Sequence, residues 1–210
     1  MVPFEVGTGF LLASVALALA PGPDNLFVLT LSALHGRRAG LFVVLGLCTG
    51  LLLHIGAVAL GLAAIIQTSP ATFLLLKFIG AAYLLWLAWG AFRAGTAKVD
   101  RGEMEPLTPL QLYPRGIVMN VTNPKVGVFF LAFLPQFVDS ARGPVALQIV
   151  VLGLLFIVAT LVVFGAVAVG AGSLSAWFHR SPSVEIGLNR LAALIFVALA
   201  LRLTLTPVVA

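Results

Sequence analysis

The stretch APGPDN, residues 20–25, lies about halfway along an apolar segment that runs from Phe4 to Leu34. Its two prolines lack a backbone N–H donor, and each proline ring obstructs the preceding helical turn. A regular helix therefore cannot continue through Pro21, Gly22 and Pro23. The sequence predicts two half-helices with a break between them.

The stretch NVTNPK, residues 120–125, likewise places a proline inside an apolar segment, from Tyr113 to Val138. Here Pro124 removes the donor and disturbs the turn before it, and apolar residues again lie on both sides. The sequence therefore predicts a second helix that is broken at a proline.

The composition predicts that lipid is the solvent of this chain. Of the 210 residues, 61% are hydrophobic and 9% are charged, whereas an ordinary soluble domain carries roughly a quarter charged residues. One bilayer crossing needs about 20 mostly apolar residues, and the run from Val145 to Val169 is apolar on every face, which favours helices over a barrel. The chain is thus expected to be an all-α integral membrane protein with about six spans: Phe4 to Leu34, Leu41 to Ile66, Phe73 to Phe92, Tyr113 to Val138, Val145 to Trp177 and Ile186 to Thr206.

Both breaks should lie within the membrane. As one continuous helix, the first segment would be ~46 Å long at 1.5 Å per residue, which exceeds a hydrocarbon core of ~30 Å. Each half of the chain opens with a broken helix and has three spans, so the two halves are expected to form a 3+3 inverted repeat. The domain interpretation is one transmembrane transporter domain, 1–210, with repeat 1 at about 1–95, a cytoplasmic linker at about 96–112 and repeat 2 at about 113–210.

The basic residues indicate topology instead of a nucleic-acid partner. The net charge is +5, but Lys and Arg are scattered singly or in pairs at segment ends, with no basic stripe for a phosphate backbone. They concentrate at the first, third and fifth breaks, and the positive-inside rule assigns those breaks to the cytoplasm. Both termini are therefore predicted to lie outside.

Asp24 and Lys125 are the charges that need an explanation, because each follows a proline at the centre of a predicted span. A charge at the bilayer centre costs at least ~2.5–3.5 kcal/mol on insertion scales. Aligning Pro23 on Pro124 places Asp24 opposite Lys125, so the repeat would bring the two side chains toward a shared polar cavity. They could pair directly as a structural ion pair, or bind the ammonium and carboxylate of an amino acid.

The asparagines near the breaks and one histidine could each have a functional or a structural role. Asn25, Asn120 and Asn123 could bind substrate, or could satisfy backbone groups that the prolines leave free. His54, in the middle of the second span, could carry a proton or could be a packing histidine. Lys77, one turn inside the third helix, is expected to be structural and to reach water through its long side chain.

Small residues at four-residue spacing allow close helix contacts. Gly46 and Gly50 have this spacing, as do Gly36 and Gly40. They could form a homodimer face, although packing within one subunit is the more common use. No metal or cofactor site is predicted.

Several motifs resemble the lysine exporter (LysE) superfamily, and within it the threonine and homoserine exporter branch. They are PGPDNLFVL at 21–29, SALHGRRAGL at 32–41 with Leu45 and Gly46, GAAYL at 80–84, WLAW at 86–89, and Asn120 with Asn123, Pro124 and Lys125. The resemblance covers essentially the whole chain and is most specific in the first half.

This resemblance implies a multi-pass exporter of the bacterial inner membrane that moves amino acids, driven by the proton motive force. Neutral substrates such as threonine, homoserine or leucine are the expected cargo, carried by alternating access. By motif, the residues implied around the transport path are Pro21, Gly22, Pro23, Asp24, Asn123, Pro124 and Lys125.

Three other functions compete with amino acid export. Export of a metal ion or another small solute is the stronger rival, although the membrane interior offers few hard ligands. An electron carrier would need two facing cysteines, and Cys48 is the only one. An enzyme would need a nucleophile with a base or a metal motif, and His35, His54 and His179 have no such spacing.

Overall fold

The computed structural model describes residues 2–20, 22–68, 70–94, 107–180 and 182–205, and the described residues fold into helices joined by short loops, without a strand. The elements are α1 (Phe4–Leu19), α2 (Pro23–His35), α3 (Arg37–Thr68), α4 (Pro70–Arg93), α5 (Pro109–Val121), α6 (Pro124–Val128), the π-helix η1 (Phe129–Phe133), the 3-10 helices η2 (Leu134–Phe137) and η3 (Ser140–Arg142), α7 (Val145–Arg180) and α8 (Pro182–Leu205). The all-α prediction is confirmed. Part of the predicted linker, and Pro21, lie outside the described residues.

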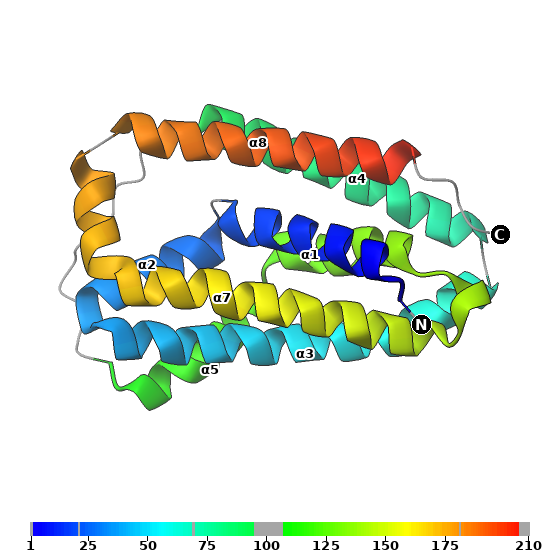
Figure 1. Cartoon of the computed structure of the whole chain (residues 1–210), viewed down its shortest axis with the longest axis horizontal. Coiled ribbons are helices and arrows are strands. Elements are labelled where there is room, and N and C mark those ends of the chain that lie inside the picture. Colours follow the sequence, from blue (N-terminus) through cyan, green and yellow to red (C-terminus); the bar gives the residue numbers. More distant parts are fainter. Residues whose placement is uncertain (1, 21, 69, 95–106, 181, 206–210) are drawn as a thin grey trace.

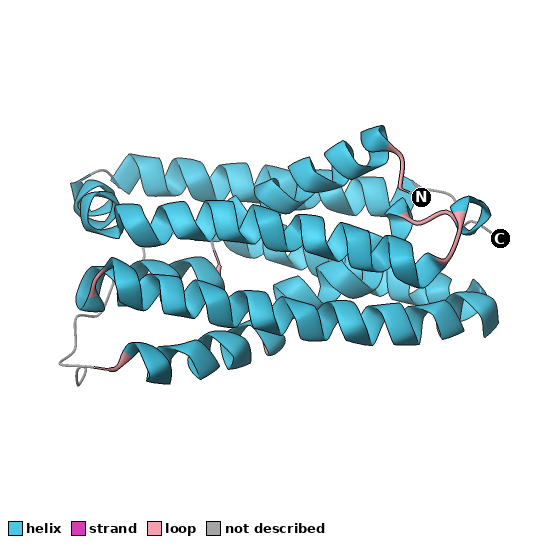
Figure 2. Cartoon of the chain, turned by 60° about the horizontal axis from the view of Figure 1, so that its bottom comes forward, coloured by secondary structure: helices cyan, strands magenta, loops and turns pink. Residues whose placement is uncertain are grey.

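The long helices run lengthwise beside one another (Figures 1 and 2). Helix α3 packs against α5 and α7, α1 packs against α7, and α4 packs against α8. In Figure 1 the α4–α8 pair forms a layer above α1, with α7 and α3 below. Asp24 and Lys125, which follow the two breaks, are buried, so both breaks lie inside the bundle.

Membrane spans follow from length and apolar character. Within the described residues, Arg37–Gly61 and Val145–Ala171 are each long and apolar enough to cross a bilayer, and two bent helix pairs qualify when each pair is taken as one span. Helices α4 and α8 have 24 residues each and coincide with the third and sixth predicted segments. The structure thus supports two to four spans directly, and six spans remain the prediction.

The two predicted breaks are confirmed as bends. Phe4–Leu19 and Pro23–His35 meet at 59°, and Leu110–Val121 meets Pro124–Phe137 at 50°. Pro23 and Pro124 each occupy the first helical position after the bend, where a missing N–H costs nothing. The second broken helix continues irregularly, because α6 passes into a π-helix at Phe129 and then into a 3-10 helix.

The ends of the bundle differ in which loops they carry. The start of α1 and the end of α8 lie at one end, together with the α3–α4 and η2–α7 connections (Figure 1). The α2–α3 connection, the end of α4, the start of α5 and the α7–α8 connection lie at the other. This agrees with the predicted grouping of the first, third and fifth breaks on one side.

Apolar side chains occupy both the interior and the surface. Phe10, Phe129, Phe130 and Phe133 are fully buried at the centre of the larger core cluster. On the surface, Leu60 is 82% exposed and Phe4 is 88% exposed. Such apolar surface is suited to lipid and not to water.

Glycines allow α3 and α5 to cross closely. A Cβ atom built on Gly46 would collide with the backbone of Tyr113 and lie 3.0 Å from Gly116 Cα. A Cβ atom on Gly50 would lie 2.7 Å from Asn120 Cβ. Both glycines of this pair therefore serve packing within the subunit, and the homodimer remains a prediction.

Gly46→Ala should destabilise the protein, because the added methyl group meets backbone that cannot rotate away. Overpacking of this kind costs about 1–3 kcal/mol, which should lower the midpoint of thermal unfolding in detergent by roughly 2–10 °C. Gly56→Ala on the same helix is the matched control, since a Cβ there meets nothing within 4 Å. Equal midpoints for the two variants would contradict the close crossing.

Candidate functional site

Asp24 and Lys125 occupy equivalent places at the two bends. Each is the second residue of the half-helix that follows the break, Asp24 in α2 and Lys125 in α6. Their side chains are buried, with 2% and 4% of their surface exposed. The predicted pair of buried charges at the interrupted helices is therefore present.

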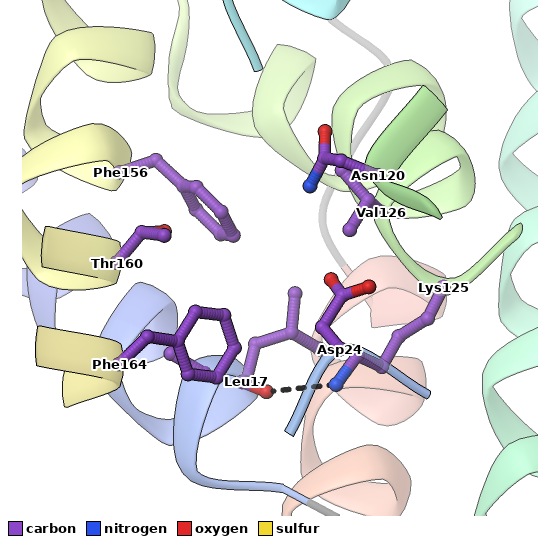
Figure 3. Close-up of a pocket in the computed structure, with 9 residues that line it drawn as sticks. Leu17, Asp24, Asn120, Lys125, Val126, Phe156, Thr160 and Phe164 are labelled. Carbon is purple, nitrogen blue, oxygen red and sulfur yellow. Dashed lines mark hydrogen bonds between the residues drawn. The ribbon is translucent and has the colours of Figure 1, made fainter. Parts of the chain in front are cut away.

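Both side chains line one pocket between the broken helices and α7 (Figure 3). In this view Asp24, Asn120, Lys125 and Val126 face the α7 side chains across the pocket. The cavity volume is about 10 Å³, which is room for roughly one water molecule. The lining residues are Leu17, Ala18, Asp24, Asn120, Lys125, Val126, Phe156, Thr160 and Phe164.

The ammonium of Lys125 is held by the end of α1. Its Nζ donates to the carbonyl oxygens of Leu17 at 3.3 Å and Ala20 at 3.1 Å, which are among the carbonyls that a helix C-terminus leaves unpaired. A cation is favourable at that end of the helix dipole. Gly22 leaves space for this arrangement, since a Cβ there would lie 2.9 Å from the Lys125 Nζ.

Asp24 and Lys125 share the pocket but do not form a salt bridge, for which the charged atoms must lie within 4.0 Å. Among the described residues, a salt bridge joins Arg142 and Asp139. The Oδ1 atom of Asp24 has no hydrogen-bond partner. Of the two readings left open by the sequence, the direct structural ion pair is therefore not the arrangement found here. Asp24 also lies at the start of α2, where the helix dipole favours an anion.

The three asparagines divide between structure and pocket. Asn25 donates from Nδ2 to the Ala18 carbonyl at 2.8 Å, and Asn123 accepts from the Lys125 backbone N–H at 3.0 Å as the N-cap of α6. Neither lines the pocket, whereas Asn120 does, and its Oδ1 has no hydrogen-bond partner. Asn25 and Asn123 thus each satisfy one backbone group at the breaks, while Asn25 Oδ1 and Asn123 Nδ2 have no hydrogen-bond partner, and their binding of substrate stays a prediction.

His54 lies just behind the pocket. Its Nε2 is 3.3 Å from the backbone oxygen of Asn120, and its ring stacks on Phe130 with centroids 5.7 Å apart. It does not line the pocket itself. Lys77 is also absent from the lining but is only 4% exposed, so the expectation that it reaches water is wrong.

Helix α7 contributes three lining residues that the sequence interpretation missed. Phe156, Thr160 and Phe164 follow at four-residue spacing and so share one helix face. Thr160 is 1% exposed, and its hydroxyl has no hydrogen-bond partner. A lone hydroxyl residue between two phenylalanines in an apolar run was the signal that could have identified this face.

The described residues contain no group of three or more His, Cys, Asp or Glu side chains that could hold a metal ion. The chemistry of the pocket is that of one carboxylate, one ammonium and two neutral polar groups among apolar walls. Such a site can hold a small molecule that carries both charges.

Comparison with known families matches the LysE type translocator model to residues 15–206. The chain belongs to this translocator family. The matched range begins within α1 and includes α2, both halves of the second broken helix and every residue of the pocket. Membership of a translocator family identifies the protein as a transporter and not as an enzyme.

Similar proteins agree with this assignment. A homoserine/homoserine lactone efflux protein of Salmonella typhimurium is 36% identical over 187 residues, 89% of this chain and 90% of the relative. An uncharacterized membrane protein of Vibrio cholerae is 33% identical over 193 residues, 91% of this chain and 93% of the relative. A leucine efflux protein of Salmonella choleraesuis is 30% identical over 131 residues, 62% of each chain. No solved structure matches the chain significantly.

Proposed function

We propose that this LysE-type translocator exports small neutral amino acids and binds them between its two broken helices. The observation that carries the proposal is a buried carboxylate and a buried ammonium that line one pocket without a salt bridge between them. The names of the relatives, homoserine/homoserine lactone efflux protein and leucine efflux protein, support amino acids as the substrate class.

A zwitterion complements both charges at once. Its ammonium would donate to Asp24, where Oδ1 is free to accept, and its carboxylate would accept from the Lys125 ammonium. The bound state would then carry no net charge, which limits the cost of holding ions inside the membrane. An amine or a carboxylic acid alone would leave one protein charge without a counterpart.

Transport requires the pocket to change size. A cavity of about 10 Å³ holds roughly a water molecule, so an amino acid enters only when the surrounding helices separate. The bends of 59° and 50° at the two breaks are the natural places for half-helices to move. We therefore infer alternating access around a closed central site.

An inverted 3+3 repeat is the architecture we infer for this motion. Under such a repeat α1 corresponds to α5, α3 to α7 and α4 to α8. The repeat would then map the α1–α7 contact onto the α5–α3 contact, and both are present. In the contacts α3–α7 and α4–α8, each helix packs against its own equivalent in the other repeat. The equivalent places of Asp24 and Lys125 add a second line of support.

We also propose a single transporter domain in the bacterial inner membrane, with both termini outside and the 96–112 linker in the cytoplasm. The supporting observation is the grouping of the first, third and fifth connections at one end of the bundle. Arg37 and Arg38 begin α3 and Arg93 ends α4 at that end, as the positive-inside rule requires for a cytoplasmic face.

His54→Gln tests proton coupling through this histidine. Gln can still donate to the Asn120 carbonyl, but it takes up no proton between pH 5 and 8. If His54 relays the proton, uptake driven by a pH gradient should fall by about tenfold while exchange without a gradient continues. An unchanged response to the gradient in reconstituted vesicles would make His54 a packing residue beside Phe130.

A counterflow assay in proteoliposomes tests the proposed function. Vesicles that contain purified protein and an unlabelled amino acid inside are given the same labelled amino acid outside, and the panel includes homoserine, threonine, leucine and lysine. Accumulation of neutral amino acids above protein-free vesicles is expected. Failure to exchange any amino acid would overturn the proposal.

A further inference from the structure

Three polar oxygen atoms among the residues that line the pocket have no hydrogen-bond partner: Asp24 Oδ1, Asn120 Oδ1 and Thr160 Oγ1. Leaving a buried polar atom unpaired costs about 1–3 kcal/mol, and such a cost is offset when a ligand supplies the hydrogen bond. Under the proposed function Asp24 receives the substrate ammonium. The role of the Thr160 hydroxyl, on the opposite wall, is then unassigned.

Thr160 behaves differently from other hydroxyl residues in these helices. In helices, Ser and Thr side chains can donate to the carbonyl four residues earlier. Six described hydroxyl residues do so, of which Ser14 and Ser32 are buried: Thr8, Ser14, Ser32, Thr49, Thr122 and Thr204. The Thr160 hydroxyl makes no such bond although it is 1% exposed. It is therefore free to bond to a molecule in the pocket.

Two apolar rings flank the Thr160 hydroxyl on the same wall of the pocket. Phe156 and Phe164 lie one helical turn to either side on the same face of α7, and both line the pocket (Figure 3). Phe156 is held in place by Phe129 and Phe130, with ring centroids 5.1 and 5.3 Å away. Once the helices separate, a short substrate side chain would have its methylene groups beside these rings and its end at Thr160.

We propose that Thr160 is a specificity-determining residue that selects a small amino acid whose side chain ends in a hydroxyl. This inference rests on the proposed function, in which Asp24 and Lys125 hold the charged ends of the substrate. Those two residues face α7 across the pocket, so the side chain of the substrate points toward Thr160. A substrate hydroxyl can either donate to or accept from the Thr160 hydroxyl, whereas a methyl group of equal size leaves it unpaired.

Homoserine and norvaline test the proposal, because they differ only by a terminal hydroxyl in place of a methyl group. In counterflow, wild-type protein should prefer homoserine by about tenfold or more in kcat/KM, since sites that bond a substrate hydroxyl reject the analogue without it. Thr160→Val keeps the shape but removes the hydroxyl, and should bring the ratio to about one. Thr160→Ser should keep the preference for homoserine.

Thr204→Val is the matched control, because the Thr204 hydroxyl bonds to carbonyls of its own helix and lies outside the pocket lining. Its ratio should equal that of wild type. Equal use of homoserine and norvaline by wild-type protein would overturn the inference even if Thr160→Val failed to fold. So would an unchanged ratio in Thr160→Val, while the proposed function would stand in both cases. Exchange of no amino acid by wild-type protein would overturn both.

Discussion

Replacing Asp24 with Asn should lower amino acid exchange by about 100-fold or more while the protein still folds. Truncating one partner of a buried charge pair costs about 2–5 kcal/mol, much of it from the charge left without a counterpart, and each 1.4 kcal/mol is tenfold in affinity. In Asp24→Asn the substrate ammonium would meet a neutral amide, and Lys125 would remain charged. Counterflow rates, normalised to folded protein from size-exclusion chromatography, measure the loss.

Asp139→Asn is the matched carboxylate control for this variant. Asp139 lies on an exposed loop beside Arg142, whose side-chain hydrogen bond lowers the pKa of that carboxyl. The residue is thus ionised near neutral pH but contacts no part of the pocket, and exchange should stay near the wild-type rate. Wild-type exchange in Asp24→Asn would remove Asp24 from the binding of the ammonium.

Lys125→Met should have an effect of similar size, about 100-fold on exchange of the amino acid. The variant loses the cation expected to bind the substrate carboxylate, and it also leaves the Leu17 and Ala20 carbonyls at the end of α1 without their donor. The second loss should lower thermal stability as well. Exchange and the unfolding midpoint must therefore both be measured.

A substrate change separates these two roles of Lys125. The amide of the same amino acid has no carboxylate, so it should be a poor substrate of wild-type protein and should lose little further in Lys125→Met. Proportional losses for the acid and its amide would indicate that Lys125 only stabilises the end of α1. Lys77→Met is the matched control: Lys77 is as buried as Lys125 but lies outside the pocket lining, and its variant should exchange normally.

Much of the framework could be predicted because its causes are local. Pro23 and Pro124 each remove a backbone donor and obstruct the preceding helical turn, and both bends occur there. Long apolar runs admit only helices in lipid, and the helices α3, α4, α7 and α8 coincide with predicted segments to within a few residues. Asp24 and Lys125 were likewise identified from the sequence, because a charge at the bilayer centre has a high insertion free energy.

Contacts between distant segments could not be predicted in this way. The Lys125 ammonium bonds to carbonyls more than 100 positions earlier in the chain, whereas the sequence offered Asp24 or a substrate carboxylate as its partner. Lys77 was expected to reach water, yet its helix turns it inward. Phe156, Thr160 and Phe164 belong to a run that looked uniformly apolar, and only their position opposite the broken helices makes them part of a site.

The sequence by itself determined an all-helical membrane protein with two interrupted helices, because backbone donors and apolar length are properties of each segment alone. Only the tertiary structure decided which polar atoms are satisfied and which remain free to bind a substrate. That difference depends on how the end of α1, the start of α6 and one face of α7 meet in space, and hydrogen bonds form only between atoms brought within about 3 Å of each other.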